Sequence, residues 1–149
     1  MLRIFFGVAA IAMLAACNVS TSTSTSNTPD APDRAALVER GKQLTDSIGL
    51  CGDCHTQRLP TGQLDLTRNF YGAVLPFKNL HPQPWAPTTP ALAGLPAGYT
   101  EAQLASFLQD GLRPDGSRPL PPMPEYRLSK EDAEAMAAYF ASLPKPPAP

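Results

Sequence analysis

Two cysteines and a histidine within five residues, Cys51-Gly-Asp-Cys54-His55, constrain this 149-residue chain more than any other feature. Three kinds of site use such a cluster. A zinc site needs four ligands, and His81 is the one further His or Cys after residue 17, so four ligands could barely be assembled. A thioredoxin-like redox pair needs a preceding strand in a βαβ unit, and the sequence has no such pattern. The third kind of site, covalent haem attachment, requires export from the cytoplasm.

The N-terminus predicts export. A short basic start precedes an apolar run over residues 4–16, which is shorter than the roughly 18 residues that a membrane-spanning helix needs. Residues 1–16 are therefore expected to be a signal peptide, and the small residues before Cys17 resemble a bacterial lipoprotein cleavage site. We expect Cys17 to carry the lipid and residues 17–32, rich in Ser and Thr, to form a solvated tether. The alternative is an ordinary signal peptide that leaves Cys17 as a free thiol.

Export favours haem attachment at the cysteine-histidine cluster. Two thiols at this spacing can bond to the two vinyl groups of one haem, and the histidine that follows is then held beneath the iron. No cysteine would remain for a disulfide, and the attached haem would stabilise a domain that buries little apolar surface. The sequence therefore predicts one haem c, covalently attached through Cys51 and Cys54, with His55 as an iron ligand.

The pattern of apolar residues predicts an all-α domain. Apolar positions at helical spacing, with capping residues before them and glycine or proline after them, predict three helices, over residues 33–48, 100–111 and 129–143. Proline is abundant, 18 of 149 residues, and residues 56–95 show no regular pattern beyond one short helical turn at most. We expect this segment to be an ordered loop that packs on the haem, since so long an irregular segment otherwise argues against a compact fold.

The second axial ligand of the iron has two main candidates. Met123 is bracketed by prolines in an extended segment with no helical face, which suits a thioether held as a weak axial ligand. Its alternative role is to cover apolar surface under a loop. His81 precedes a proline in the irregular segment and is the rival ligand. Met136 falls on the apolar face of the last predicted helix, where methionine usually fills a core.

Several motifs together resemble those of a known family. They are Cys51-Gly-Asp-Cys54-His55-Thr56, Trp85-Ala-Pro87-Thr-Thr-Pro90, Gly111-Leu-Arg-Pro-Asp-Gly116 with Pro121-Pro-Met123-Pro124, and Ser129-x-Glu131-Asp132 through Leu143-Pro144. The chain is similar to class I monohaem cytochromes c of the bacterial lipoprotein type and to the cytochrome c domains of dehydrogenase-associated subunits. The motifs together cover most of residues 33–144, before a Pro-rich tail at 145–149. The resemblance implies a small cytochrome c fold, with three to four helices and long loops around one covalently bound haem.

The resemblance also implies roles for single residues. His55 and Met123 would be the two axial ligands of a six-coordinate iron. The Pro87 carbonyl would accept the proton on the far nitrogen of His55 and so fix the imidazole ring. Trp85, Arg113 and Arg118 are candidates for binding the haem propionates, with solvent-facing side chains as the alternative for the two arginines.

Together these features predict an electron carrier outside the cytoplasm, lipid-anchored to the outer face of the cell membrane or in the periplasm. An iron with two protein ligands has no open position for a substrate, so we expect no enzymatic activity. The redox partners would be a dehydrogenase or quinol-oxidising complex as donor and a terminal oxidase or reductase as acceptor. The alternative is a peroxidase-like or gas-binding haem protein whose sixth ligand can be displaced. A net charge of −1 gives no indication of nucleic-acid binding.

Overall fold

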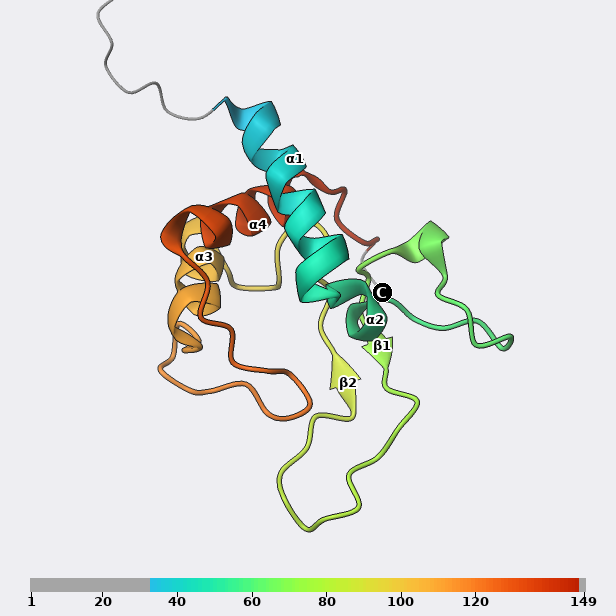
Figure 1. The fold of residues 1–149 in the computed structure, drawn as a ribbon. Helices are drawn as coiled ribbons and strands as arrows, with labels where there is room; N and C mark the ends of the chain where they lie inside the picture. Colours follow the sequence, from blue (N-terminus) through green and yellow to red (C-terminus); the bar gives the residue numbers. More distant parts are fainter. Residues whose placement is uncertain (1–32, 148–149) are drawn as a thin grey trace, which may run out of the picture. The chain divides into compact units, whose positions relative to one another are not determined.

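The computed structural model describes residues 33–147, so the predicted signal peptide at 1–16 and the predicted lipidated Cys17 with its tether to residue 32 lie outside the described residues. The regular structure of the described part is mostly helical, as predicted (Figure 1). Its α-helices are α1 (Arg34–Leu44), α2 (Cys51–His55), α3 (Glu101–Asp110) and α4 (Lys130–Ser142). No helix within residues 33–147 is long and apolar enough to cross a membrane.

Helices α1 and α4 pack closely because both present small residues to each other. Four alanines of α4 are completely buried, Ala133, Ala135, Ala137 and Ala138. On α1, a Cβ placed on Gly41 would lie 1.9 Å from the carbonyl oxygen of Ala135, so only glycine allows this approach. The first helix was predicted to reach Ile48. Instead, α1 ends at Leu44 and the chain continues as a π-helical turn, η1 (Thr45–Gly49).

The two later helices begin and end where the sequence predicts. Thr100 caps α3 in a capping box with Gln103, each side chain pairing with the backbone of the other, and Gly111 ends the helix in the left-handed conformation at φ 73°. The Ser129 side chain caps α4 by accepting a hydrogen bond from the Asp132 N–H at 3.2 Å. Helices α3 and α4 pack on each other and complete the core with buried Leu104, Leu108, Met136 and Phe140.

The segment between α2 and α3 contains little regular structure. It holds a 3-10 turn, η2 (Leu66–Arg68), and an antiparallel pair of two-residue strands, β1 (Ala73–Val74) and β2 (Thr88–Thr89). Such short strands leave no alternating pattern that a sequence could show. Phe70 anchors the segment to the core, because its ring is only 1% exposed and lies edge-on to Phe140, with ring centroids 5.3 Å apart.

Candidate functional site

A cavity of about 490 Å³ opens between α2, α3 and two loops, a size within the range of about 300–1000 Å³ usual for ligand sites. Its walls are mainly apolar. The residues predicted to hold a haem that line it are Cys51, Cys54, His55, Arg113 and Met123. Leu50 and Leu120 also line the cavity and are 53% and 43% exposed, so they lie at its mouth. The cavity thus joins the residues of the cysteine-histidine motif to the proline-rich segment around Met123.

Helix α2 carries both cysteines to the cavity. Leu50, immediately before it, takes the left-handed conformation at φ 48° and ψ 35°, which turns the chain sharply out of η1. The Cys51 thiol is buried, and this burial raises its pKa to about 12, while Cys54 is half-buried. Within residues 33–147, no group of three or more His, Cys, Asp and Glu side chains is arranged to hold a metal ion.

His55 is held in one orientation at the end of α2. Its side chain is 5% exposed, and its Nδ1 lies 2.8 Å from the carbonyl oxygen of Pro90. Because a carbonyl can only accept, Nδ1 carries the proton and donates, which leaves Nε2 as the ring nitrogen with a free lone pair. Burial lowers the pKa of His55, and the Pro90 carbonyl partly opposes this shift. A neutral, oriented imidazole is the form that binds iron.

The predicted partner of His55 was wrong. The Pro87 carbonyl accepts a hydrogen bond from the Leu75 N–H at 3.0 Å, as part of the approach of β1 to β2. Strand β2 follows Pro87 directly, so the chain reaches His55 only beyond this strand, at Pro90. Within β2, the Thr89 hydroxyl donates to the Cys54 carbonyl at 2.8 Å and joins the small sheet to α2. The sequence offers two prolines three residues apart, and no local pattern decides between them.

Met123 reaches the cavity from the loop between α3 and α4, residues 112–128, which we call the methionine loop. Its side chain is half-buried, and its N–H donates to the Leu120 carbonyl at 3.2 Å. The other two candidate ligands lie elsewhere. His81 is exposed and is not part of the cavity wall, while Met136 is 1% exposed in the core. Of these three residues, only Met123 shares the cavity with His55.

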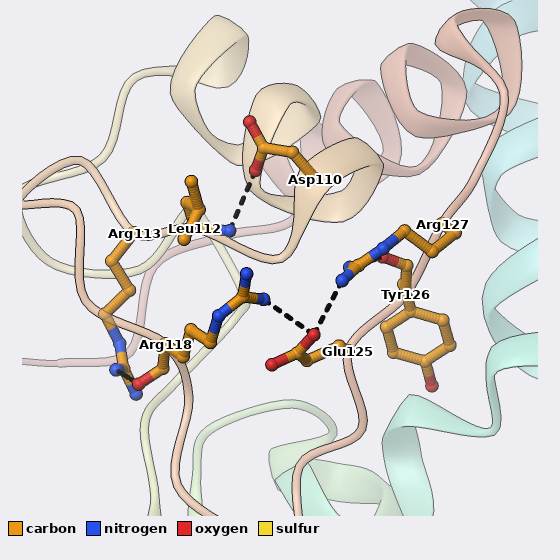
Figure 2. Close-up of polar contacts among 7 residues, drawn as sticks. All are labelled: Asp110, Leu112, Arg113, Arg118, Glu125, Tyr126 and Arg127. Carbon is orange, nitrogen blue, oxygen red and sulfur yellow. Dashed lines mark hydrogen bonds and ion pairs between the residues drawn. The ribbon is translucent and has the colours of Figure 1, made fainter.

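Of the two arginines predicted to bind the haem propionates, the structure places only Arg113 at the cavity. Arg113 lines the cavity and its guanidinium donates to the Ser117 hydroxyl at 3.3 Å and to the Arg118 carbonyl. Arg118 does not line the cavity. Figure 2 shows its guanidinium directed at Glu125, whose carboxylate it contacts at 2.7 Å, together with Arg127 at 2.6 Å. Arg118 is therefore part of a surface ion-pair network.

Trp85 lies next to the cavity rather than in its wall. Its ring meets Phe77 edge-on, with centroids 6.0 Å apart, and the following residue, Ala86, lines the cavity. The indole Nε1–H is buried and has no hydrogen-bond acceptor among the described residues. A buried donor without an acceptor is costly, so this atom marks a place for an acceptor oxygen that residues 33–147 do not supply. A haem propionate fits this description.

Tyr126 is a site residue that the sequence analysis missed. It lines the cavity three residues after Met123, and its hydroxyl donates to the carbonyl oxygen of Gly49 at 2.7 Å. Burial raises the pKa of Tyr126 to about 12. An aromatic residue shortly after a loop methionine was the available signal, but its partner lies 77 residues away in sequence and has no sequence pattern.

Comparisons with known proteins agree with this geometry. Residues 38–144 match the family described as Cytochrome c. The cytochrome c subunits of alcohol dehydrogenase (quinone) from Gluconacetobacter polyoxogenes and Komagataeibacter europaeus are each 32% identical over 97% of this chain and 28% of their own length. A diheme cytochrome c-type protein of Cereibacter sphaeroides is 30% identical over 75% of this chain and 37% of its own length. The chain thus spans about a third of the length of the curated relatives that it matches.

Proposed function

Because the chain belongs to the cytochrome c family and carries covalently attached haem c, we propose that it is a one-electron carrier whose iron is bound by His55 and Met123. The observation that carries this proposal is the shared cavity. His55 at the end of α2 and Met123 on the methionine loop both line it, whereas the rival ligand His81 is exposed and does not. Cys51 and Cys54 stand at the positions of the two thioether bonds in the family motif.

The haem supplies a one-electron couple when it is attached, and the chain determines how that couple behaves. The Pro90 carbonyl orients the His55 ring so that Nε2 is available to the iron. Bound to the iron, the Met123 thioether would be a weak, soft ligand that stabilises the reduced state, and the apolar cavity wall would disfavour the additional charge of the oxidised state. We therefore expect a positive reduction potential.

Trp85 and Arg113 are the residues that we propose to face the propionates. The Trp85 Nε1–H is a buried donor that lacks an acceptor among residues 33–147, and Arg113 is one of the residues that line the cavity. A carboxylate that accepts from Trp85 would satisfy that donor, and a neighbouring cation would offset its charge. Arg118, whose guanidinium pairs with Glu125, is not included in this proposal.

The proposed ligand pair excludes enzymatic chemistry at the iron. If both axial positions are filled by side chains, a peroxide or a small gas finds no open position. The peroxidase-like or gas-binding alternative requires that the substrate or gas readily displaces Met123 from the iron. The half-buried side chain and the prolines on either side of Met123 support a ligand that stays in place.

The methionine–iron absorption band at the red end of the ferric spectrum tests the ligand assignment. We expect wild-type protein to show this weak band, Met123→Ala to lose it, and His81→Ala to keep it. His81→Ala is the matched control because it removes the rival ligand from an exposed site. A band that disappears in His81→Ala and persists in Met123→Ala would overturn the assignment.

The partners and the location of the protein are also proposals. The relatives named as cytochrome c subunits of alcohol dehydrogenase (quinone) support a dehydrogenase as electron donor, and a terminal oxidase or reductase is the proposed acceptor. Export with a lipid on Cys17 would keep the carrier at a membrane. Mass spectrometry of the mature protein tests this, because cleavage before Cys17, one lipid and one haem give a defined mass. A mature chain that still carries residues 1–16 would contradict the proposal.

A further inference from the structure

One hydrogen bond connects the two segments that carry the proposed axial ligands. The Tyr126 hydroxyl donates to the Gly49 carbonyl oxygen at 2.7 Å, at the edge of the cavity that both residues line. Tyr126 lies three residues after Met123, and Gly49 lies two residues before Cys51. The bond therefore joins the methionine loop to the segment that leads into α2.

The acceptor belongs to a tightly held part of the chain. A Cβ placed on Gly49 would lie 3.0 Å from the Cys51 sulfur and 3.2 Å from the terminal carbon of Met136, so the Gly49 backbone is packed between the attachment site and the core. Leu50, the next residue, is in the strained left-handed conformation, which a well-packed environment must maintain. A donor bound to the Gly49 carbonyl is thus tied to a closely packed part of the backbone.

Apart from the Tyr126 bond, the side-chain hydrogen bonds of the methionine loop are exposed. Its ion pairs between Glu125 and the two arginines involve side chains that are more than a third exposed, and such exposed pairs contribute little in solution. The backbone N–H groups of Arg113, Gly116 and Met123 donate within the loop, and two further backbone bonds reach other segments. The Leu128 N–H donates to Leu108 of α3 at 3.1 Å, and Pro121 accepts from the Ala86 N–H at 2.9 Å. The Tyr126 hydroxyl adds a bond from the loop to the segment that leads into the two cysteines.

We infer that Tyr126 is a positioning residue for Met123: its hydroxyl, bound to Gly49, couples the methionine loop to the Cys51–His55 segment and so keeps the methionine thioether at the iron. This inference rests on the proposed His55 and Met123 ligation. Tyr126 acts through the loop and is not itself a ligand. Without the hydroxyl, the half-buried Gly49 carbonyl loses its donor, and the loop opens at a smaller free-energy cost.

Displacement of Met123 by added imidazole measures this coupling in the intact haem protein. Tyr126→Phe keeps the ring in the cavity wall and removes only the hydroxyl. In this variant, we expect the imidazole concentration that reduces the methionine–iron band to half to be roughly 5- to 30-fold lower than in wild type. This factor corresponds to the loss of one buried hydrogen bond. Tyr139→Phe is the matched control, because Tyr139 is a buried core tyrosine that does not line the cavity.

The outcomes separate this inference from the assignment on which it rests. A titration that is unchanged in Tyr126→Phe, or one that shifts equally in Tyr139→Phe, overturns the positioning role while leaving the ligands in place. Absence of the band from wild-type protein overturns the ligand assignment itself and the inference with it. Urea unfolding of the same variants provides the second measurement. A loss of global stability without easier displacement would show that Tyr126 has only a general structural role.

Discussion

The two walls of the cavity are held by different kinds of interaction. The wall that carries His55 is short and buried, and it is fixed by the Pro90 and Thr89 bonds and by packing on the core. The wall that carries Met123 is a long loop whose side-chain contacts are largely exposed, apart from the bond of Tyr126 to Gly49. Under the proposed ligation, the first wall would attach and orient the haem, and the second would close the sixth coordination position of the iron. We expect substitutions in the first wall to prevent haem attachment and substitutions in the second to open the sixth coordination position of the iron.

Removal of both thiols from the wall that carries His55 should have the largest effect, the loss of covalent haem attachment. In Cys51→Ala with Cys54→Ala, no thioether can form, so we expect no covalent haem on the protein. Mass spectrometry of the intact chain after organic extraction of free haem measures this directly. Asp53→Ala, an exposed position between the two cysteines, is the control and should retain its haem. Haem that stays covalently bound in the double variant would refute the attachment site.

Gly41→Ala tests the helical packing that supports the histidine wall. The added methyl group would lie 1.9 Å from the Ala135 carbonyl oxygen, so α1 must move away from α4. We expect the free energy of unfolding, from urea titration, to fall by about 3 kcal/mol, as for other overpacked cores. Gln43→Ala, exposed on the same helix, should change it by less than ~0.5 kcal/mol. Equal effects of the two variants would contradict the close approach of these helices.

Asp65→Asn should produce a smaller, pH-dependent loss of stability in the segment after α2. The Thr67 hydroxyl and the Arg68 guanidinium lower the pKa of Asp65. A lowered pKa in the folded state means that the ionised carboxylate stabilises the fold above its ordinary pKa of about 3.9. This contribution disappears as the pH falls through the lower, folded-state pKa. Unfolding titrations of wild type and variant should therefore differ at pH 7 and converge in strong acid. A constant difference across this range would be the contrary result.

Glu125→Gln should have the smallest effect, because it removes exposed ion pairs on the methionine loop. The Glu125 carboxylate contacts both Arg118 and Arg127 (Figure 2). We expect a slight loss of stability at low ionic strength that vanishes in about 1 M salt, where exposed charges are screened. A large effect that survives in high salt would show that these surface pairs, rather than the Tyr126 bond, hold the loop.

The features that the sequence predicted correctly depend on neighbouring residues. Thr100 with Gln103 and the glycine at 111 define α3 because capping interactions span only a few residues. The spacing of Cys51, Cys54 and His55 likewise indicates haem attachment, because all three residues lie within one short helix. Local composition singled out Met123, since a methionine between prolines has no helix face to join; the structure places it on the cavity wall, and its role as an iron ligand stays a prediction.

The features that were missed depend on contacts between distant segments. The choice of Pro90 over Pro87 is made by the pairing of β2 with β1, which uses the Pro87 carbonyl before the chain reaches His55. The end of α1 at Leu44, with the π-helical turn after it, gave no signal in the apolar spacing. The bond from Tyr126 to Gly49 spans 77 residues, so no local rule could indicate it.

Exposure of the reduced protein to carbon monoxide is the most direct test of a closed iron bound by His55 and Met123. Carbon monoxide binds ferrous haem only where an axial position is open or readily vacated. We expect the absorption spectrum of the reduced wild-type protein to stay unchanged on addition of the gas and the spectrum of reduced Met123→Ala to shift at once. Prompt binding by the wild-type protein would contradict the account and favour a haem protein with a displaceable sixth ligand.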